Sequence, residues 1–205
     1  MSAIVEPKID YLDASFNGAL MSPEEFDAVE DWDPAYEYEL IRGVVIVNPI
    51  PSEGETDPND ELGMLLRAYQ ALHPHGHTLN KTLPEQYVYL PDGSRRKADR
   101  LIWAGIGRRP HPKKEMPTIV VEFVSRAARD RRRDYEEKRR EYLALGVQEY
   151  WVIDRFRRRM SVFRPDGSEQ TVGEQEKFQT PLLPGFELPL SQLLALSDEW
   201  EDTEK

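Results

Sequence analysis

The sequence contains no cysteine among its 205 residues. Disulfide bonds and thiolate metal sites are therefore excluded, and the redox compartment is left open. The sequence also lacks a long apolar stretch that could cross a membrane, and its N-terminal MSAIVEPKID lacks the hydrophobic region of a signal peptide. We therefore expect a cytoplasmic, soluble protein with no membrane partner.

Several catalytic motifs are missing as well. We find no glycine-rich phosphate loop, no Ser-His-Asp arrangement and no dinucleotide fingerprint, and Gly105-Ile106-Gly107 is too short to count as one. The length fits one domain with a full core plus tails. We expect a loose arm over residues 1–20, one domain over residues 21–196 and an acidic tail over residues 197–205.

Positive charge is scarce overall but concentrated in one region. The net charge of −11 argues against broad non-specific affinity for nucleic acid. Between Arg108 and Arg159, however, there are 16 Lys/Arg and 9 Asp/Glu, a local charge of +7 that leaves −18 for the remainder. A solvated helix face and a phosphate-binding surface both explain such a run, and the two interpretations stay open here.

The first part of the chain predicts several elements. SPEE at residues 22–25 is typical of a helix start, with serine at the N-cap and glutamate three positions later. YEYELIRGVVIV, residues 36–47, predicts a hairpin with Glu39 on its first strand. Residues 48–58 are rich in proline, glycine and glutamate and predict a mobile loop, and residues 59–72 predict an amphipathic helix.

Three histidines, His73, His75 and His77, follow this helix at alternate positions. Imidazole is a good zinc ligand, but this spacing matches no structural zinc site and brings no partner ligands. We therefore interpret HPHGH as a polar turn rather than a metal site.

Two predicted strands carry acids where apolar residues are expected. In the strand over residues 97–104, Asp99 shares a face with Leu101 and Trp103. Glu122 interrupts the β-branched apolar run of residues 118–124, which is typical of a strand covered on both faces. A buried carboxylate costs several kcal/mol unless a charged group meets it.

The helix that follows carries a lysine in its apolar stripe. Tyr135, Lys138, Tyr142 and Leu145 are spaced by three, four and three residues, so they lie on one helical face. Lys138 should therefore face the sheet and meet Glu122. Such an arrangement is either a buried ion pair or an active site.

Together these charges suggest a metal site. Carboxylates on neighbouring strands suit Mg²⁺ or Mn²⁺, which would polarise a phosphodiester and lower the pKa of a bound water. A lysine nearby could orient that water or stabilise developing charge. Each residue also has a structural alternative: Glu122 as a satisfied core acid, Asp99 as a solvent-facing strand end, and Lys138 as the partner of Asp134.

Six blocks of the sequence resemble the Uma-two family, also called a domain of unknown function. They are YELIRG (38–43), the Asp99 strand, VVEFVS (120–125), DYEEKRREY (134–142), GVQEYWVID (146–154) and LLPGFELPL (182–190). The resemblance extends from about Met21 to Leu194. Members are restriction-endonuclease-like proteins of the PD-(D/E)xK nuclease superfamily. The resemblance therefore implies a single-domain α/β fold with a mixed central sheet flanked by helices and an N-terminal hairpin.

The resemblance also implies a metal-dependent nuclease site. Asp99 and Glu122 match the superfamily's metal-binding acids, and Glu39 matches the family's YEL glutamate. The superfamily's lysine would fall at Val124 and is missing; Lys138 on the following helix is the expected replacement. Two further departures are Ala98, where the family usually has proline, and Arg100, where it usually has an apolar residue.

We therefore expect an endonuclease that hydrolyses DNA with Mg²⁺ or Mn²⁺. Asp99 and Glu122 would bind the metal, Lys138 would assist and Glu39 would support the site. The basic loops at residues 108–114 and 126–133 would contact phosphates. The alternative is a catalytically silent binding or regulatory module with the same fold, and a purely structural protein explains the buried charges least well. A homodimer would suit cleavage of two strands.

Overall fold

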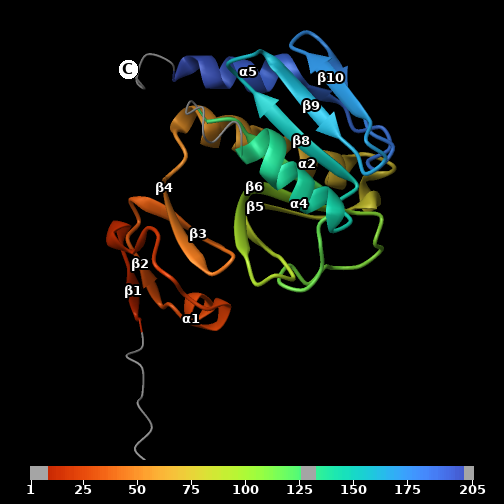
Figure 1. The fold of residues 1–205 in the computed structure, drawn as a ribbon. Helices are drawn as coiled ribbons and strands as arrows, with labels where there is room; N and C mark the ends of the chain where they lie inside the picture. Colours follow the sequence, from red (N-terminus) through yellow and green to blue (C-terminus); the bar gives the residue numbers. More distant parts are fainter. Residues whose placement is uncertain (1–8, 126–132, 201–205) are drawn as a thin grey trace, which may run out of the picture. The chain divides into compact units, whose positions relative to one another are not determined.

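The computed structural model describes residues 9–125 and 133–200 (Figure 1). The chain groups into two compact units: residues 1–50 and 87–97 form the first, and residues 51–86 and 98–205 form the second. The single domain expected over residues 21–196 stays a prediction. Each unit has its own apolar core, and we describe the two separately.

The first unit is built around a β-hairpin. Its elements are β1 (Tyr11–Leu12), η1 (Ala14–Phe16), α1 (Pro23–Asp27), β2 (Asp31–Trp32), β3 (Tyr36–Ile41) and β4 (Val44–Pro49). The predicted hairpin is confirmed, because β3 pairs antiparallel with β4. Arg42 and Gly43 at its turn both have positive φ, as a two-residue hairpin turn requires. β3 also pairs with the start of β6 (Arg95–Ala104), where Leu40 lies opposite Arg95.

The predicted helix start is confirmed in α1. The Ser22 hydroxyl accepts the amide of Glu25 at 3.2 Å, and the Glu25 carboxylate accepts the amide of Ser22 at 2.7 Å. The loose arm expected over residues 1–20 is wrong for residues 9–20, because Leu12 is buried in the core of this unit. Residues 1–8 lie outside the part that the structure describes.

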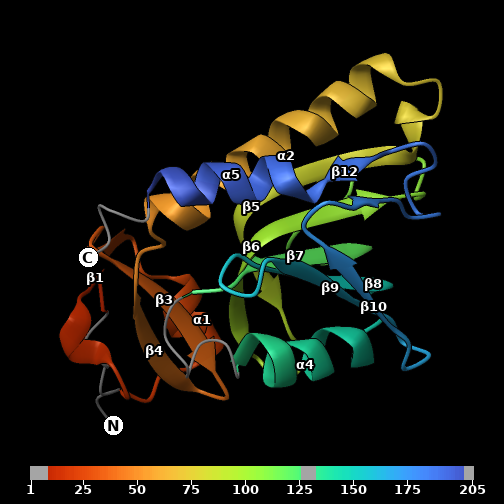
Figure 2. The same ribbon diagram turned by 90° about the horizontal axis from the view of Figure 1, so that it is seen from above.

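The second unit is a mixed sheet between helices. Its strands run in the order β10-β9-β8-β7-β6, with β5 also paired to β6, and β7 and β8 are parallel. Its elements are α2 (Glu53–Leu72), η2 (Gly76–Thr78), β5 (Leu79–Tyr89), β6, β7 (Ile119–Phe123), η3 (Arg133–Lys138), α4 (Arg139–Ala144), β8 (Glu149–Asp154), β9 (Arg159–Phe163), β10 (Glu169–Gly173), β11 (Lys177–Phe178), β12 (Leu188–Pro189) and α5 (Leu190–Glu199). Helices α2 and α5 lie on one face of the sheet and α4 lies on the other (Figure 2). This confirms the expected mixed sheet flanked by helices.

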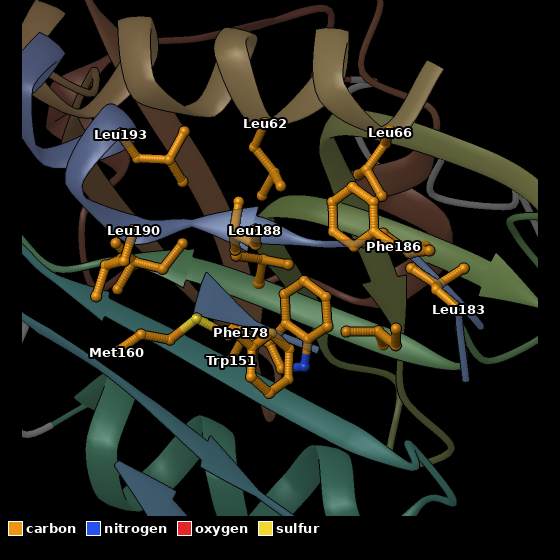
Figure 3. Packing of buried hydrophobic residues seen from close by; sticks show 14 of the residues in the cluster. Leu62, Leu66, Trp151, Met160, Phe178, Leu183, Phe186, Leu188, Leu190 and Leu193 are labelled. Carbon is orange, nitrogen blue, oxygen red and sulfur yellow. The ribbon is translucent and has the colours of Figure 1, made fainter. Parts of the chain in front are cut away.

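The main core lies between the sheet and the pair of helices α2 and α5. Leu62 and Leu66 of α2 and Leu190 and Leu193 of α5 point toward Trp151 of the sheet (Figure 3). Strand residues of one parity supply the sheet side of this core, as alternation along a strand dictates: Ile102, Val121, Trp151, Ile153 and Val162. Residues of the other parity, including Glu122, therefore face α4.

The mobile loop expected over residues 48–58 is wrong. β4 continues to Pro49, and α2 begins at Glu53, so Pro58 lies inside the helix. A proline there has no N–H for the carbonyl four residues earlier, that of Gly54. The hydroxyl of Ser197 donates to that carbonyl at 2.9 Å instead. This contact, remote in sequence, provides a donor for the carbonyl that Pro58 cannot satisfy.

The same contact corrects the expected tail. α5 continues to Glu199, and Ser197 is buried, so the tail does not begin at residue 197. Residues 201–205 lie outside the described part. No helix in the described ranges combines the length and the apolar character needed to span a bilayer.

Candidate active site

Glu122 and Lys138 form a buried ion pair. Lys138 Nζ donates to Glu122 Oε2 at 2.8 Å, and the two side chains are 4% and 3% exposed. Glu122 lies in the middle of β7, and Lys138 is the last residue of η3. The predicted contact between Glu122 of the strand and Lys138 of the helix is thus confirmed.

Aromatic contacts place Lys138 over the sheet. Tyr135 packs edge-on against Phe163 of β9, and Tyr142 packs edge-on against Tyr150 of β8. Both tyrosines belong to the stripe predicted from the sequence, and Tyr142 is fully buried. η3 is a π-helical turn, a deviation from α-helix geometry that is frequent at functional sites.

Asp99 lies beside Glu122 on the same face of the sheet. β6 and β7 are antiparallel with Arg100 opposite Val121, and continuing this register by one residue sets Asp99 beside Glu122. One oxygen of Asp99 accepts the backbone N–H of Phe123, the residue after Glu122, at 2.5 Å. The structure therefore brings Asp99, Glu122 and Lys138 together from two strands and a helix.

Glu39 belongs to the first unit. Its Oε1 accepts the backbone N–H of Lys97 at 2.9 Å, and its Oε2 lies 3.9 Å from the guanidinium of Arg96. All three residues are in that unit, and Glu39 and Arg96 are both buried. The supporting role expected for Glu39 stays a prediction.

Arg100 occupies the opposite face of β6 from Asp99. Its guanidinium donates to the side chain and the backbone carbonyl of Asn59 on α2, at 2.8 and 2.6 Å, and to the Thr82 hydroxyl at 3.1 Å. Burial lowers the pKa of Arg100 to about 10. The side-chain amide of Asn59 in turn donates to the carbonyl of Asp99 at 2.9 Å. Arg100, which stands where the family usually has an apolar residue, thus connects the strand that carries Asp99 to α2.

Asp154 is a buried acid that the sequence patterns did not single out. It ends β8 with no exposed surface, and its Oδ2 accepts the hydroxyl of Tyr135 at 3.2 Å. The only available signal was an acid at the end of an apolar strand, which is also common in turns. Its burial was decided by packing against η3, which the sequence did not reveal.

The carboxylates of Asp99 and Glu122 are chemically suited to a hard metal ion. Asp99 and Glu122 offer carboxylate oxygens, and Mg²⁺ commonly takes one or two protein carboxylates and completes its shell with water and phosphate. Among the described residues, no group of three or more His, Cys, Asp or Glu could hold a metal ion by itself. The turn predicted at His73, His75 and His77 is confirmed, because α2 ends at Leu72 and the short helix η2 begins at Gly76.

The two basic loops differ in what the structure shows. The loop after β6 contains Arg108, Arg109 and Lys114, all exposed; Arg108 pairs with Glu115 at 2.9 Å. Nearly all of the second loop, residues 126–132, lies outside the described part.

Both the sequence and the fold of this chain are similar to those of known proteins. A family model, Uma2, described as "Putative restriction endonuclease", matches residues 23–191, and the chain belongs to this family. The fold is similar to the crystal structure of a "putative nuclease belonging to DUF820" from Anabaena variabilis. That similarity has a TM-score of 0.67 at 14% identity and covers 86% of this chain and 99% of the other. No curated protein matches the chain. The resemblance seen in the sequence is confirmed, and the family supports a nuclease-like function.

Proposed function

We propose that this protein is a metal-dependent endonuclease that hydrolyses phosphodiester bonds in DNA. The observation that carries the proposal is the buried Lys138–Glu122 pair with Asp99 beside it on one face of the sheet. Membership of a family described as restriction endonucleases supports it. Burying three charges costs free energy that stability does not require, and buried charges with close partners are common at functional sites.

Asp99 and Glu122 would hold Mg²⁺ or Mn²⁺. Once bound, the ion would supply Lewis-acid polarisation of the phosphodiester and an acidified water. Glu122 also fixes the ammonium of Lys138, which keeps a positive charge beside the reacting phosphate. The exposed arginines and lysines of residues 108–114 would contact the DNA backbone.

Lys138 would orient the attacking water or stabilise the charge that develops on the phosphate. Glu39 would support the site. We place the protein in the cytoplasm, and a homodimer would present two sites to two strands.

A second candidate is a catalytically silent module of the same fold. The observation that favours it is that Glu122 Oε2 is already engaged by Lys138. The net charge of −11 favours it as well, because it weakens non-specific attraction to DNA. Such a module would bind its partner without divalent metal.

A calorimetric titration with Mn²⁺ tests the proposal. We compare the wild type with Asp99→Ala and Glu122→Ala, and use Glu149→Gln as a control that alters a buried carboxylate at the start of β8. Binding in the wild type and the control that is lost in both site variants is the expected result. Equal binding in all four proteins, or none in any, contradicts the proposed site.

Cleavage of supercoiled plasmid separates the two candidates. The nuclease requires Mg²⁺ or Mn²⁺ and loses activity by at least about 100-fold in Asp99→Ala and Glu122→Ala. Retained DNA binding with no cleavage at any metal concentration identifies the silent module instead.

A further inference from the structure

Asp154 lies on the same face of the sheet as Glu122. Val152 is the neighbour of Glu122 across the parallel pair β7 and β8, and Asp154 is two residues further along β8. Side chains two residues apart on a strand share a face. Asp154 therefore faces η3 from the end of its strand, and it is completely buried there.

The Asp154 carboxylate is held from the hairpin that follows it. Its Oδ1 accepts the backbone N–H of Arg157 at 3.0 Å, and the guanidinium of Arg157 lies 3.8 Å from Oδ2. Arg157 also lies over the ring of Tyr135, 5.4 Å from its centroid. The hairpin after β8 therefore holds the Asp154 carboxylate independently of η3.

Tyr135 links the Asp154 carboxylate to η3. Its hydroxyl donates to Asp154 Oδ2 at 3.2 Å, and its ring packs on Phe163. Burial raises the pKa of Tyr135, and the negative charge of Asp154 raises it further, so the hydroxyl keeps its proton and remains a donor.

Tyr135 and Lys138 both belong to η3 and both contact the sheet, Tyr135 through Phe163 and Lys138 through Glu122. Tyr142 contacts the sheet on the other side of Lys138, through Tyr150. Lys138 therefore lies between two tyrosines that both contact the sheet. Of the two, Tyr135 donates a hydrogen bond to Asp154.

We propose that Asp154 and Tyr135 form a positioning pair that fixes Lys138 against Glu122. Both residues would act through the lysine rather than on the substrate. The catalytic consequence of the pair rests on the proposed nuclease function, whereas the positioning itself does not.

The test measures how well the ammonium of Lys138 is held. A buried ammonium in an ion pair exchanges its protons slowly with water, and its NH₃⁺ signal is then visible by NMR in protein carrying ¹⁵N-labelled lysine. Lys138→Met assigns the signal. Tyr135→Phe removes only the hydroxyl, Asp154→Leu removes the acceptor, and Asp154→Asn keeps an acceptor oxygen. Glu149→Leu is the matched control, since it removes another buried carboxylate of β8 whose position in the strand places it on the opposite face.

We expect the Lys138 signal in the wild type, in Asp154→Asn and in Glu149→Leu. In Tyr135→Phe and Asp154→Leu, proton exchange should accelerate by at least about tenfold, which is a loss of protection typical of local opening. An unchanged signal in Tyr135→Phe overturns the proposal, even where Asp154→Leu does not fold. Absence of the signal in the wild type overturns it too, because the ammonium is then not held.

Catalysis supplies an independent readout. In an active enzyme, Tyr135→Phe should lower kcat by about tenfold and leave KM unchanged, since the pair orients a group needed in the transition state. Equal kcat in wild type and Tyr135→Phe contradicts the catalytic consequence. If the wild type shows the Lys138 signal but binds no Mn²⁺, and Tyr135→Phe loses the signal, the positioning pair is supported and the nuclease function is overturned.

Discussion

At the scale of single residues, the Lys138–Glu122 pair differs from the exposed ion pairs among the described residues, and it is about as buried as the Arg96–Glu39 pair. Arg158 and Glu174, for example, are about one-third exposed, and exposed pairs contribute little to stability. A pair as buried as Lys138–Glu122 loses the hydration of both charges, so apolar residues of the same volume would stabilise the fold equally well. Stability alone does not require these residues in the core, which supports the chemical role that we propose for Lys138 and Glu122.

The network around Arg158 gives a pH-dependent prediction. Arg158 donates to Glu174 and to Asp198 of α5, and its hydrogen bond lowers the pKa of Glu174 below the ordinary 4.5. A carboxyl whose pKa is lower in the folded state stabilises the fold above its unfolded pKa, and this contribution is lost as the pH falls through the lower value. Glu174→Gln should therefore reduce the free energy of unfolding at pH 7, and the reduction should disappear as the pH falls through the lowered pKa of Glu174.

Urea denaturation at several pH values measures this difference. In an Arg158→Ala background the same substitution should have little effect at any pH, because the partner is gone. A reduction that persists unchanged at low pH would show that Glu174 acts by packing rather than by charge.

At the scale of elements, α2 shows how a helix tolerates an internal proline. Pro58 cannot donate to the carbonyl of Gly54, and Ser197 of α5 does so instead. The N-terminal part of α2 is therefore stabilised by α5.

Ser197→Ala should lower the free energy of unfolding by about 1–3 kcal/mol, because the buried carbonyl of Gly54 loses its donor. Pro58→Ala restores an N–H that can donate to the same carbonyl. The double variant Ser197→Ala/Pro58→Ala should therefore lose less stability than Ser197→Ala alone, as measured by urea denaturation. Strict additivity of the two changes would contradict this account.

At the scale of the whole molecule, charge is distributed unevenly. The excess of acidic residues, −11 in total, repels DNA at long range, whereas residues 108–159 carry +7. If the protein binds DNA as we propose, binding must depend on local contacts that overcome the overall repulsion, and it should weaken steeply with salt.

Arg109→Gln/Lys114→Gln tests the described part of this surface. If both side chains contact phosphates, the slope of log affinity against log salt should fall by about 1.8, close to 0.9 for each lost contact. Arg42→Gln/Lys177→Gln changes the net charge equally at exposed positions elsewhere and is the control. Fluorescence anisotropy with a labelled duplex measures both, and equal slopes in the two variants would exclude a local contact.

The sequence by itself determined most elements and the two strands and helix of the site. The capping box at Ser22, the hairpin turn at Arg42-Gly43 and the stripe containing Lys138 depend on local spacing, which needs no information about distant residues. Local spacing also marks the start of α2, where the Glu55 carboxylate accepts the amide of Ser52 at 2.8 Å in a capping box. Tertiary structure alone decided the donor to the carbonyl of Gly54 and the burial of Asp154. In both cases the deciding partner, Ser197 or Tyr135, is remote in sequence, and no local pattern encodes a hydrogen bond formed only when two elements pack.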